Sequence, residues 1–469
     1  MSQLEDRDAV IGRADLEQPV PSVPVEATST TTDASAGTAN GSAAPSARPE
    51  APSPVEGGWF TRTFAAMEIP DYRLLWFGGV LSFVSFQMQM IARSWLAYEL
   101  TGSNSTLGLV MFGMGVPMLV LTPWGGVAAD RLSKRKVILA AQWLLIVSGL
   151  ALAVAVVMDV IAVWMLVASG VVQGASFAAL GPSRMAFTSD LVGRRLLPNA
   201  IVLQQMSMNG TRIFGPSLAG VLVGLHWFGA GGVFFLTTAL TFLASLMTFR
   251  LPPGLPNGNR TPGRAFAEFA DGLRYVKRHP HLLLLLVVSL VIVMTAFPYV
   301  AFLPTLSDDV FGFGSSGYGL MSGATAIGAI GSLLFVAGRS SGPNIWILQA
   351  SAGLCFGIGL VMLALTGSFW SAMAVLVFIG GATAAFQSLN NALVLMGSES
   401  AYHGRVQSLM MLSFSGFGMV ALPLGVIADR IGLQTLFGWM GAITTAVMLA
   451  YFVIRPILER RHPTPVFAD

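Results

Sequence analysis

One short stretch decides the fold of this chain: GVAADRLSKRK, residues 126–136. It joins two long apolar stretches, 105–126 and 137–158, and places one carboxylate and four basic side chains between them. Each apolar stretch has the ~20 residues that a helix needs to cross the ~30 Å hydrocarbon core of a bilayer. We therefore expect residues 126–136 to form a turn at a membrane surface, between two transmembrane helices.

The whole chain has the composition of a membrane protein. Of its 469 residues, 54% are hydrophobic and only 10% are Asp, Glu, Lys or Arg, and the mean hydropathy is +0.70. A soluble domain carries roughly 25% charged residues, so this chain cannot cover itself with a water-facing surface. The 52 glycines agree with a membrane protein, because small residues let membrane helices pack closely.

The net charge and the cysteine count narrow the possible partners and cross-links of the chain. The net charge of +3 does not indicate a nucleic-acid partner, because in a membrane protein the distribution of Lys and Arg matters more than their sum. Cys355 is the single cysteine, so no intramolecular disulfide can form.

Apolar stretches of spanning length follow one another from Tyr72 onward. Those of the first half are 72–98, 105–126, 137–158, 160–181, 198–224 and 230–250, and those of the second half are 281–304, 317–338, 344–366, 370–395, 405–427 and 435–455. They predict an all-α integral membrane protein, with about twelve transmembrane helices in two pseudo-symmetric six-helix bundles.

The same pattern divides the chain into five segments. Residues 1–57 lack aromatic residues and are rich in Ala, Ser, Thr, Pro and Glu, which predicts a disordered cytoplasmic tail and no secretory signal. The two six-helix halves are expected at 58–250 and 281–455. A cytoplasmic linker at 251–280 separates them, and a second cytoplasmic tail follows at 456–469.

Charged residues in alternate loops set the orientation. One side receives the linker and twelve basic residues: Arg131, Lys134, Arg135, Lys136, Arg184, Arg194, Arg195, Arg339, Arg405, Arg455, Arg460 and Arg461. The other side holds Arg430 beside acidic residues: Glu99, Asp159, Asp308, Asp309 and Asp429. This asymmetry predicts a multi-pass cell-membrane protein with both termini in the cytoplasm. Aromatic residues near span ends predict an interfacial belt: Trp76, Trp95, Tyr98, Trp124 and Trp370.

A candidate gate lies in the opening stretch, at Gly126, Asp130, Arg131 and Arg135. The glycine permits close helix packing, and Asp130 is placed to pair with an arginine of a neighbouring helix. Such a pair, made in one conformation and broken in another, biases a two-state gate. The alternative is an ordinary positive-inside loop, which is favoured for the basic residues alone but not for the whole arrangement.

These residues resemble the signature between helices 2 and 3 of the major facilitator superfamily of transporters. Further segments resemble its drug-efflux and siderophore-exporter branch: 95–103, 181–184, 269–276 and 404–406. The resemblance covers residues 60–455. It implies two bundles that rock about a substrate site between them. It further implies a small-molecule substrate, proton antiport and function as a monomer.

The fifth span carries a second motif, Gly210 to Gly220. Pro216 removes a backbone donor, and Gly215 and Gly220 permit close approach of a neighbouring helix. The motif resembles one in superfamily exporters that seals the outer half against leak; the alternative is a structural kink. Arg212 lies well inside the span, where a charge costs at least ~2.5 kcal/mol. It is expected to contact substrate, to act as a coupling switch, or to be an interior hydrogen-bond hub.

Other polar residues lie within spans. The resemblance implies that helices 1, 4, 7 and 10 line the cavity, which makes Gln87, Gln173, Gln387 and Asn390 possible substrate contacts; each is equally suited to an interhelical hydrogen bond. Arg93 is near the outer end of its helix and is expected to extend to the interface.

Two departures from the family pattern concern the coupling. The resemblance implies a basic residue three positions before the pair Gln173-Gly174, but that position is Gly170. No carboxylate lies near the middle of a span. Proton antiport is therefore implied by the resemblance alone.

Nothing in the sequence indicates an enzyme. There is no GxxxxGK[ST] phosphate loop, the histidines lack metal-ligand spacing, and no cofactor or metal is expected. The favoured function is an exporter of amphiphilic small molecules such as drugs, siderophores or lipophilic metabolites. An uptake symporter of the same fold and a non-transporting membrane scaffold or sensor are the alternatives.

Overall fold

The computed structural model describes residues 64–225, 227–254, 264–337, 345–399 and 402–461. All of them belong to one compact unit, Pro54–Asp469. The predicted tails, 1–57 and most of 456–469, lie outside the described residues. Within the described ranges every element is a helix.

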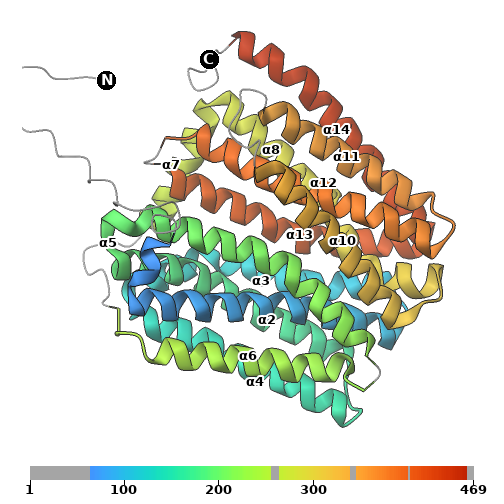
Figure 1. The fold of residues 1–469 in the computed structure, drawn as a ribbon, viewed down its shortest axis with the longest axis horizontal. Helices are drawn as coiled ribbons and strands as arrows, with labels where there is room; N and C mark the ends of the chain where they lie inside the picture. The colour runs from blue at the N-terminus through green and yellow to red at the C-terminus, as the bar shows by residue number, and fades with distance from the viewer. Residues whose placement is uncertain (1–63, 226, 255–263, 338–344, 400–401, 462–469) are drawn as a thin grey trace, which may run out of the picture. The chain divides into compact units, whose positions relative to one another are not determined.

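The long helices follow the predicted spans closely. Those of the first half are α2 (Pro70–Thr101), α3 (Asn104–Arg131), α4 (Lys134–Val157), α5 (Val163–Gly224) and α6 (Gly229–Phe249). Those of the second half are α8 (Pro280–Thr295), α10 (Gly314–Ala337), α11 (Ile345–Ala364), α12 (Phe369–Met396), α13 (His403–Ile431) and α14 (Leu433–Arg461). Figure 1 shows the two sets as two groups of roughly parallel rods.

The all-helical membrane fold is confirmed. Among the described residues, nine helices are long and apolar enough to cross a membrane. The spans predicted at 198–224, 317–338 and 405–427 are helical as well over their described residues, but each contains positions outside the described side chains. For these three, the transmembrane assignment stays a prediction.

Helix α5 contains two predicted spans, 160–181 and 198–224. They are separated by a break at Gly193, whose φ of 67° and ψ of 175° lie outside the helical region and favour glycine. The first of the two helices therefore runs about eleven residues beyond the predicted end. Arg184, expected in a loop, lies on the helix as a result.

The seventh span is irregular. After α8 the chain continues as η2 (Phe297–Phe302), α9 (Leu303–Thr305) and η3 (Leu306–Val310), and together they form one candidate span, Pro280–Val310. Pro298 and Pro304 interrupt the regular hydrogen bonding, because proline has no backbone N–H.

Two helices were not predicted. The short η1 (Ala65–Glu68) precedes α2, and α7 (Arg264–Arg278) lies in the polar linker. Helix α7 contacts α13 and α8 of the second half and also α3 of the first. Its mixed polar and apolar sequence was too polar to stand out as a span.

Close helix packing depends on glycine at particular positions. A Cβ added at Gly125 of α3 would lie 2.0 Å from the carbonyl oxygen of Ala178 on α5. One added at Gly380 of α12 would lie 1.9 Å from that of Thr325 on α10. No other residue fits at such distances, which is the packing expected of small residues in membrane helices.

The predicted aromatic belt is partly wrong. Trp124 and Trp370 are 59% and 70% exposed, as lipid-facing residues should be. Trp95 and Tyr98 are buried instead, at 8% and 4%. Both take part in contacts with the second half, described below, and a position near a span end does not distinguish these two environments.

Two glycines of α10 provide a matched test of the packing. We expect Gly328→Ala to destabilise the protein by roughly 1–3 kcal/mol, the usual cost of overpacking, because the new Cβ would lie 1.8 Å from the carbonyl oxygen of Val377. Gly323→Ala on the same helix meets no atom within 4 Å and should not lower stability, since alanine favours helix. Thermal unfolding of the purified proteins in detergent compares them; equal melting temperatures would contradict the packing.

Candidate functional site

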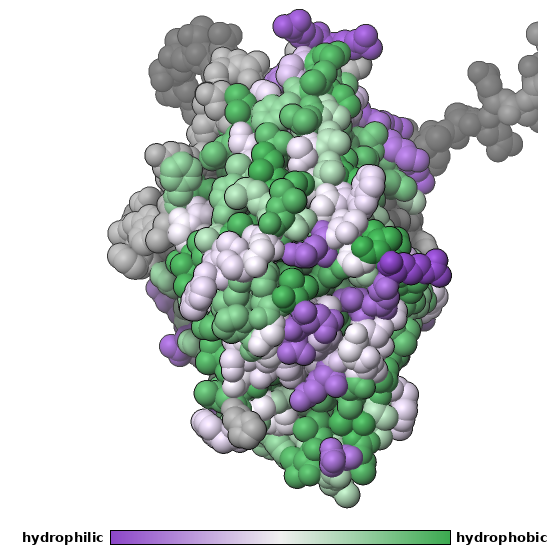
Figure 2. All heavy atoms as spheres, turned by 90° about the vertical axis from the view of Figure 1, so that its right-hand side faces the viewer, coloured by the Kyte–Doolittle hydropathy of each residue, from purple (hydrophilic) through white to green (hydrophobic). Residues whose placement is uncertain are grey.

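The candidate site is the surface between the two halves, together with the polar groups buried beside it. Three specific contacts join the halves at the end of the bundle where α2 ends and α3 begins, in addition to the packing of α3 along α13. We call this the outer end, because the charge distribution predicts that it faces away from the cytoplasm. In Figure 2, which faces this end, hydrophilic side chains gather across the middle with hydrophobic ones around them.

The first contact caps α3 with a carboxylate from α13. The backbone N–H of Asn104 donates to Asp429 Oδ1 at 2.9 Å, and the N–H of Ser105 donates to Asp429 Oδ2 at 2.9 Å. The hydroxyl of Ser103 donates to the same Oδ2 at 2.9 Å. The first N–H groups of a helix have no partner within it and favour an anion. Asp429 thus satisfies the start of a helix in the opposite half.

The ionisation of Asp429 suits this role. Burial raises the pKa of Asp429, but the hydrogen bonds from Ser105, Ser103 and Asn104 outweigh it and hold the pKa below its ordinary value. The carboxylate is therefore ionised at neutral pH. Because its pKa is lowered, the cap is complete at neutral pH and weakens only as the pH falls through that lowered value.

The second contact joins α2 to the seventh span and to α10. The hydroxyl of Tyr98 lies 2.5 Å from Asp309 Oδ1 and 3.1 Å from Asp308 Oδ2, and donates to this pair of carboxylates. The ring of Trp95 stacks on Tyr318 of α10, with 5.9 Å between centroids.

The third contact brings α5 against α10 through glycines. A Cβ added at Gly220 would lie 2.9 Å from Gly319 Cα, and Ser316 Oγ donates to the carbonyl of Gly224 at 3.4 Å. Gly323, one turn further along α10 and away from the outer end, has no atom within 4 Å of an added Cβ. Open space therefore lies beside α10 at Gly323.

An apolar layer lies beneath these contacts. Met111 and Met114 of α3 are buried against Ala301 of η2 and Ala421 of α13. Phe86, Met90 and Phe417 pack around them. We call this cluster of seven the roof, since it closes the space between the halves on the outer side.

The first half holds a buried polar cluster around Arg93. Its Nη2 donates to Gln173 Oε1, its Nη1 to Ser169 Oγ at 3.4 Å, and its Nε to the carbonyl of Gln89 at 3.3 Å. Gln173 Nε2 donates in turn to Gln89 Oε1 at 3.3 Å, and Gln89 Nε2 to Thr237 Oγ1 at 3.3 Å. The cluster joins α2, α5 and α6, so Gln173 makes interhelical hydrogen bonds.

The expectation that Arg93 extends to the interface is wrong. The residue is only 2% exposed, because the amide and hydroxyl acceptors of α2 and α5 satisfy it inside the half. A Cβ at Gly170 would lie 3.5 Å from Arg93 Nη1. Gly170 is the position at which the family resemblance implies a basic residue, so here a cation from α2 occupies the neighbourhood of that position.

The second half has a smaller polar cluster. Asn390 Nδ2 donates to Ser289 Oγ at 3.2 Å, and Gln349 Nε2 donates to Asn390 Oδ1 at 3.3 Å. Asn390 is buried and joins α12 to α8 and α11, which supports the interhelical role. Gln387, one turn earlier on α12, is half-buried.

The fifth-span motif meets the first span at Gly215. A Cβ there would lie 2.6 Å from Gln87 Cβ, so the half-buried Gln87 packs over the glycine. Pro216 is half-buried, and the chain remains helical through it. The side chain of Arg212 lies outside the described residues, and its predicted role stays a prediction.

A second buried cation, Arg184 on α5, faces α2. Its Nη2 donates to Ser82 Oγ at 2.8 Å and approaches the carbonyl of Gly78 at 3.4 Å. Its guanidinium lies 5.9 Å from the centroid of the Phe83 ring. The sequence analysis placed Arg184 in a loop, because the predicted span ended at residue 181. Helix α5 is longer than predicted, and Arg184 therefore lies on a helix that faces α2.

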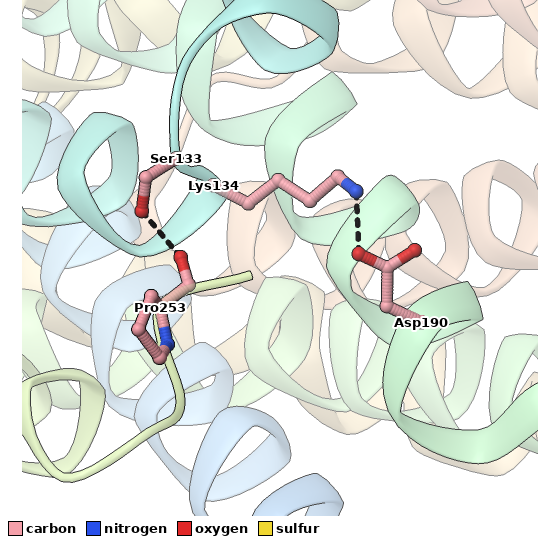
Figure 3. A network of polar contacts seen from close by, with 4 residues as sticks. All are labelled: Ser133, Lys134, Asp190 and Pro253. Atoms are coloured by element: carbon pink, nitrogen blue, oxygen red, sulfur yellow. Dashed lines mark hydrogen bonds and ion pairs between the residues drawn. The ribbon is translucent and has the colours of Figure 1, made fainter. Parts of the chain in front are cut away.

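The opposite end of the bundle is held by contacts within the first half. Lys134 at the start of α4 pairs with Asp190 of α5, and the hydroxyl of Ser133 donates to the carbonyl of Pro253, as Figure 3 shows. Arg135 Nη1 donates to the carbonyl of Leu251 at 2.7 Å. These contacts tie the loop after α3 to its own half.

The predicted gate is only partly within the described residues. Arg131 is exposed and Arg135 binds backbone carbonyls of its own half. The surroundings of Gly126 and of the Asp130 side chain are not among the described residues. The pairing of Asp130 therefore stays a prediction.

The linker helix α7 fastens to α13. Asp271 pairs with Arg405, the backbone N–H of Glu399 donates to Tyr275 Oη at 3.0 Å, and the Tyr275 and Tyr402 rings stack at 3.9 Å. Helix α13 is thus anchored to the linker at one end and to α3, through Asp429, at the other.

Sequence reasoning missed Asp429 although a signal was present. Residues 425–430, GVIADR, repeat residues 126–131, GVAADR, with one difference. The repeat places Asp429 at the end of α13 as it places Asp130 at the end of α3. Among the described residues, no group of three or more His, Cys, Asp or Glu side chains is arranged to hold a metal ion.

Comparison with known proteins identifies the family. The sequence profile described as "Transmembrane secretion effector" matches residues 61–465. The Staphyloferrin A transporter of Staphylococcus aureus is 23% identical, over 80% of this chain and 94% of its own length. Macrolide efflux protein A of Streptococcus pyogenes is 22% identical, over 82% and 95%. The enterobactin exporter EntS of Shigella flexneri is 26% identical, over 81% and 87%.

Solved structures agree on the fold. The nucleoside transporter NupG superposes with a TM-score of 0.59 at 16% identity, over 81% of this chain and 98% of its own. A POT family transporter superposes with a TM-score of 0.63 at 13% identity, over 83% and 96%.

The Arg93 cluster can be tested by a double-mutant cycle. Arg93→Met and Gln173→Leu should be non-additive by about 1–2 kcal/mol, the upper range for polar contacts between membrane helices, because each removes the other's partner. Unfolding in mixed detergent gives the four free energies. Arg93→Met combined with Asn390→Leu, in the other half, should be additive; additivity in both pairs would exclude the Arg93–Gln173 interaction.

Proposed function

Because the chain belongs to the transmembrane secretion effector family, within the efflux and siderophore branch of the major facilitator superfamily, we propose that this secondary transporter exports amphiphilic small molecules. It alternates access by rocking its two halves and is driven by proton antiport. It works as a monomer in the cell membrane, with both termini in the cytoplasm.

The observation that carries the proposal is the placement of the contacts between the halves. Asp429, the Asp308–Asp309 pair and Gly220 all join them at the outer end, above the roof. One turn further along α10, an added Cβ at Gly323 would meet no atom within 4 Å. A transporter closed on the outside by few hydrogen bonds can open there without disturbing either half, which supports alternating access.

The relatives support the direction and the substrate class. Two of them carry efflux or export in their names, for a macrolide and for enterobactin. The roof supports amphiphilic substrates, because its methionines, Met90, Met111 and Met114, adapt to varied apolar surfaces.

Flux in membrane vesicles tests the direction. Inside-out vesicles with an acidified lumen should accumulate a macrolide or a catecholate, and a protonophore should abolish the accumulation. Vesicles from a strain lacking the protein are the control. Accumulation only in right-side-out vesicles would establish an uptake symporter instead, and no flux of any compound in either orientation would favour a non-transporting scaffold.

The outer closure has its own test at Asp429. Asp429→Ala should populate the outward-open state about tenfold more, because a lost charged hydrogen bond of ~1.5 kcal/mol corresponds to that factor. With Cys355→Ser as background, Ala421→Cys in the roof should react correspondingly faster with an impermeant thiol reagent added outside. Glu99→Ala removes an exposed carboxylate at the same end and should leave the rate unchanged. Equal rates for all three proteins would show that Asp429 does not hold the closure.

A further inference from the structure

Arg184 is an incompletely satisfied cation inside the first half. The residue is 5% exposed. Its Nη2 donates to Ser82 and Gly78, while its buried Nε has no hydrogen-bond partner among the residues that the structure describes. A buried charge with an unused donor is costly, and no carboxylate among the described residues forms an ion pair with Arg184. Arg93, by contrast, uses all three of its guanidinium nitrogens.

Arg184 also lines a small cavity. The cavity is partly open and has a volume of ≈ 20 Å³, enough for one water molecule, which needs roughly 10–15 Å³. The polar lining comes from α5, from Thr188, Gln204 and Ser207 in addition to Arg184. The apolar lining comes from α2 and includes Trp76 and Phe83. A cation, hydroxyl and amide groups and aromatic rings on opposite walls are the mixture found in sites for small organic molecules.

Gly79 of α2 keeps this cation accessible. A Cβ at that position would lie 3.0 Å from Arg184 Nη1, tighter than an ordinary contact. The cavity wall therefore approaches the guanidinium only because residue 79 has no side chain.

The cavity lies between α2 and α5 within the first half, on the face of α2 that packs against α5. Trp76, Gly79, Phe83, Phe86 and Met90 follow one another at spacings of three and four, which places them along one face of the helix. Phe86 and Met90 pack into the roof, which also contains Ala301, Ala421 and Phe417 of the second half. The cavity is thus two turns below the roof, toward the end where the charge distribution predicts the cytoplasm.

We infer that the Arg184 cavity binds the carboxylate group of an amphiphilic acid. The carboxylate fills the water-sized space when the compound enters from the cytoplasmic side. Arg184 Nε and Nη1 donate to the carboxylate, Thr188 and Gln204 complete its hydrogen bonds, and Phe83 and Trp76 contact the apolar body. This assignment rests on the proposed transport function, whose substrate class it narrows from amphiphiles to acidic amphiphiles.

A matched pair of ligands tests the charge requirement. Purified full-length protein is titrated with para-butylbenzoate and with the neutral para-butylbenzamide, and binding is followed by tryptophan fluorescence; Trp76→Phe identifies the signal of the cavity. We expect the acid to bind about tenfold tighter, which is 1.4 kcal/mol. Acetate supplies the same anion without an apolar body. If acetate binds as tightly as the acid, the cavity is a free-anion site and the inference is wrong.

Variants assign the preference to Arg184. Arg184→Gln should reduce the acid-to-amide ratio to about one, and Gly79→Ala, which leaves Arg184 in place, should lower the acid affinity severalfold if the first variant does not fold. Arg250→Gln removes an exposed guanidinium of the first half that does not line the cavity, and should retain the ratio. A folded Arg184→Gln or Gly79→Ala protein with the full preference would overturn the assignment.

The outcome is separable from that of the vesicle experiment. Flux of neutral compounds without any preference for acids would leave the exporter and remove only the acidic subsite. A preference for acids in a protein that moves nothing would leave the subsite and remove the transport function.

Discussion

Polar side chains inside a bilayer must find their partners within the protein, because hydrocarbon offers none. In this chain two buried guanidinium groups of the first half show the constraint. Arg93 extends from α2 to Ser169 and Gln173 of α5, and Arg184 extends from α5 to Gly78 and Ser82 of α2. The two helices are thus joined in both directions by buried hydrogen bonds, at two levels. A conformational change that separated them would leave charges unsatisfied, so α2 and α5 move together.

The surface between the halves is of a different kind. It is formed by glycines that bring backbones together, by a few aromatic and methionine side chains, and by carboxylates at its outer rim. Opening this surface costs few hydrogen bonds, and those at the rim can be replaced by water. Rigid halves with a separable surface between them are what rocking requires, and packed interfaces of this type tend to have discrete alternative arrangements.

The sequence predicted where the helices begin and end, but it did not predict which neighbouring helix a given side chain contacts. Helix bounds followed from apolar length, so 72–98 and 435–455 lie within α2 and α14 almost as expected. Arg93, Trp95 and Tyr98 were assigned to the membrane interface from their distance to a span end, but which face of the helix they occupy is set by packing against α5 and α10. The α3 cap was missed because Asp429 and Asn104 lie more than 300 residues apart. Only the repeated GVxADR pattern connected them in sequence.

The charge of the substrate affects whether the transporter needs a buried carboxylate to carry a proton. No carboxylate lies in the middle of a predicted span, and proton antiport was inferred from the family without a residue to carry it. A monoanion that leaves the cell moves in the direction favoured by an inside-negative potential, which contributes about 2.3 kcal/mol per 100 mV for each charge. Exchange for one proton adds a second charge moving favourably. For such a substrate the membrane potential supplies much of the driving force, and a dedicated buried carboxylate is less necessary than it is for a cationic drug.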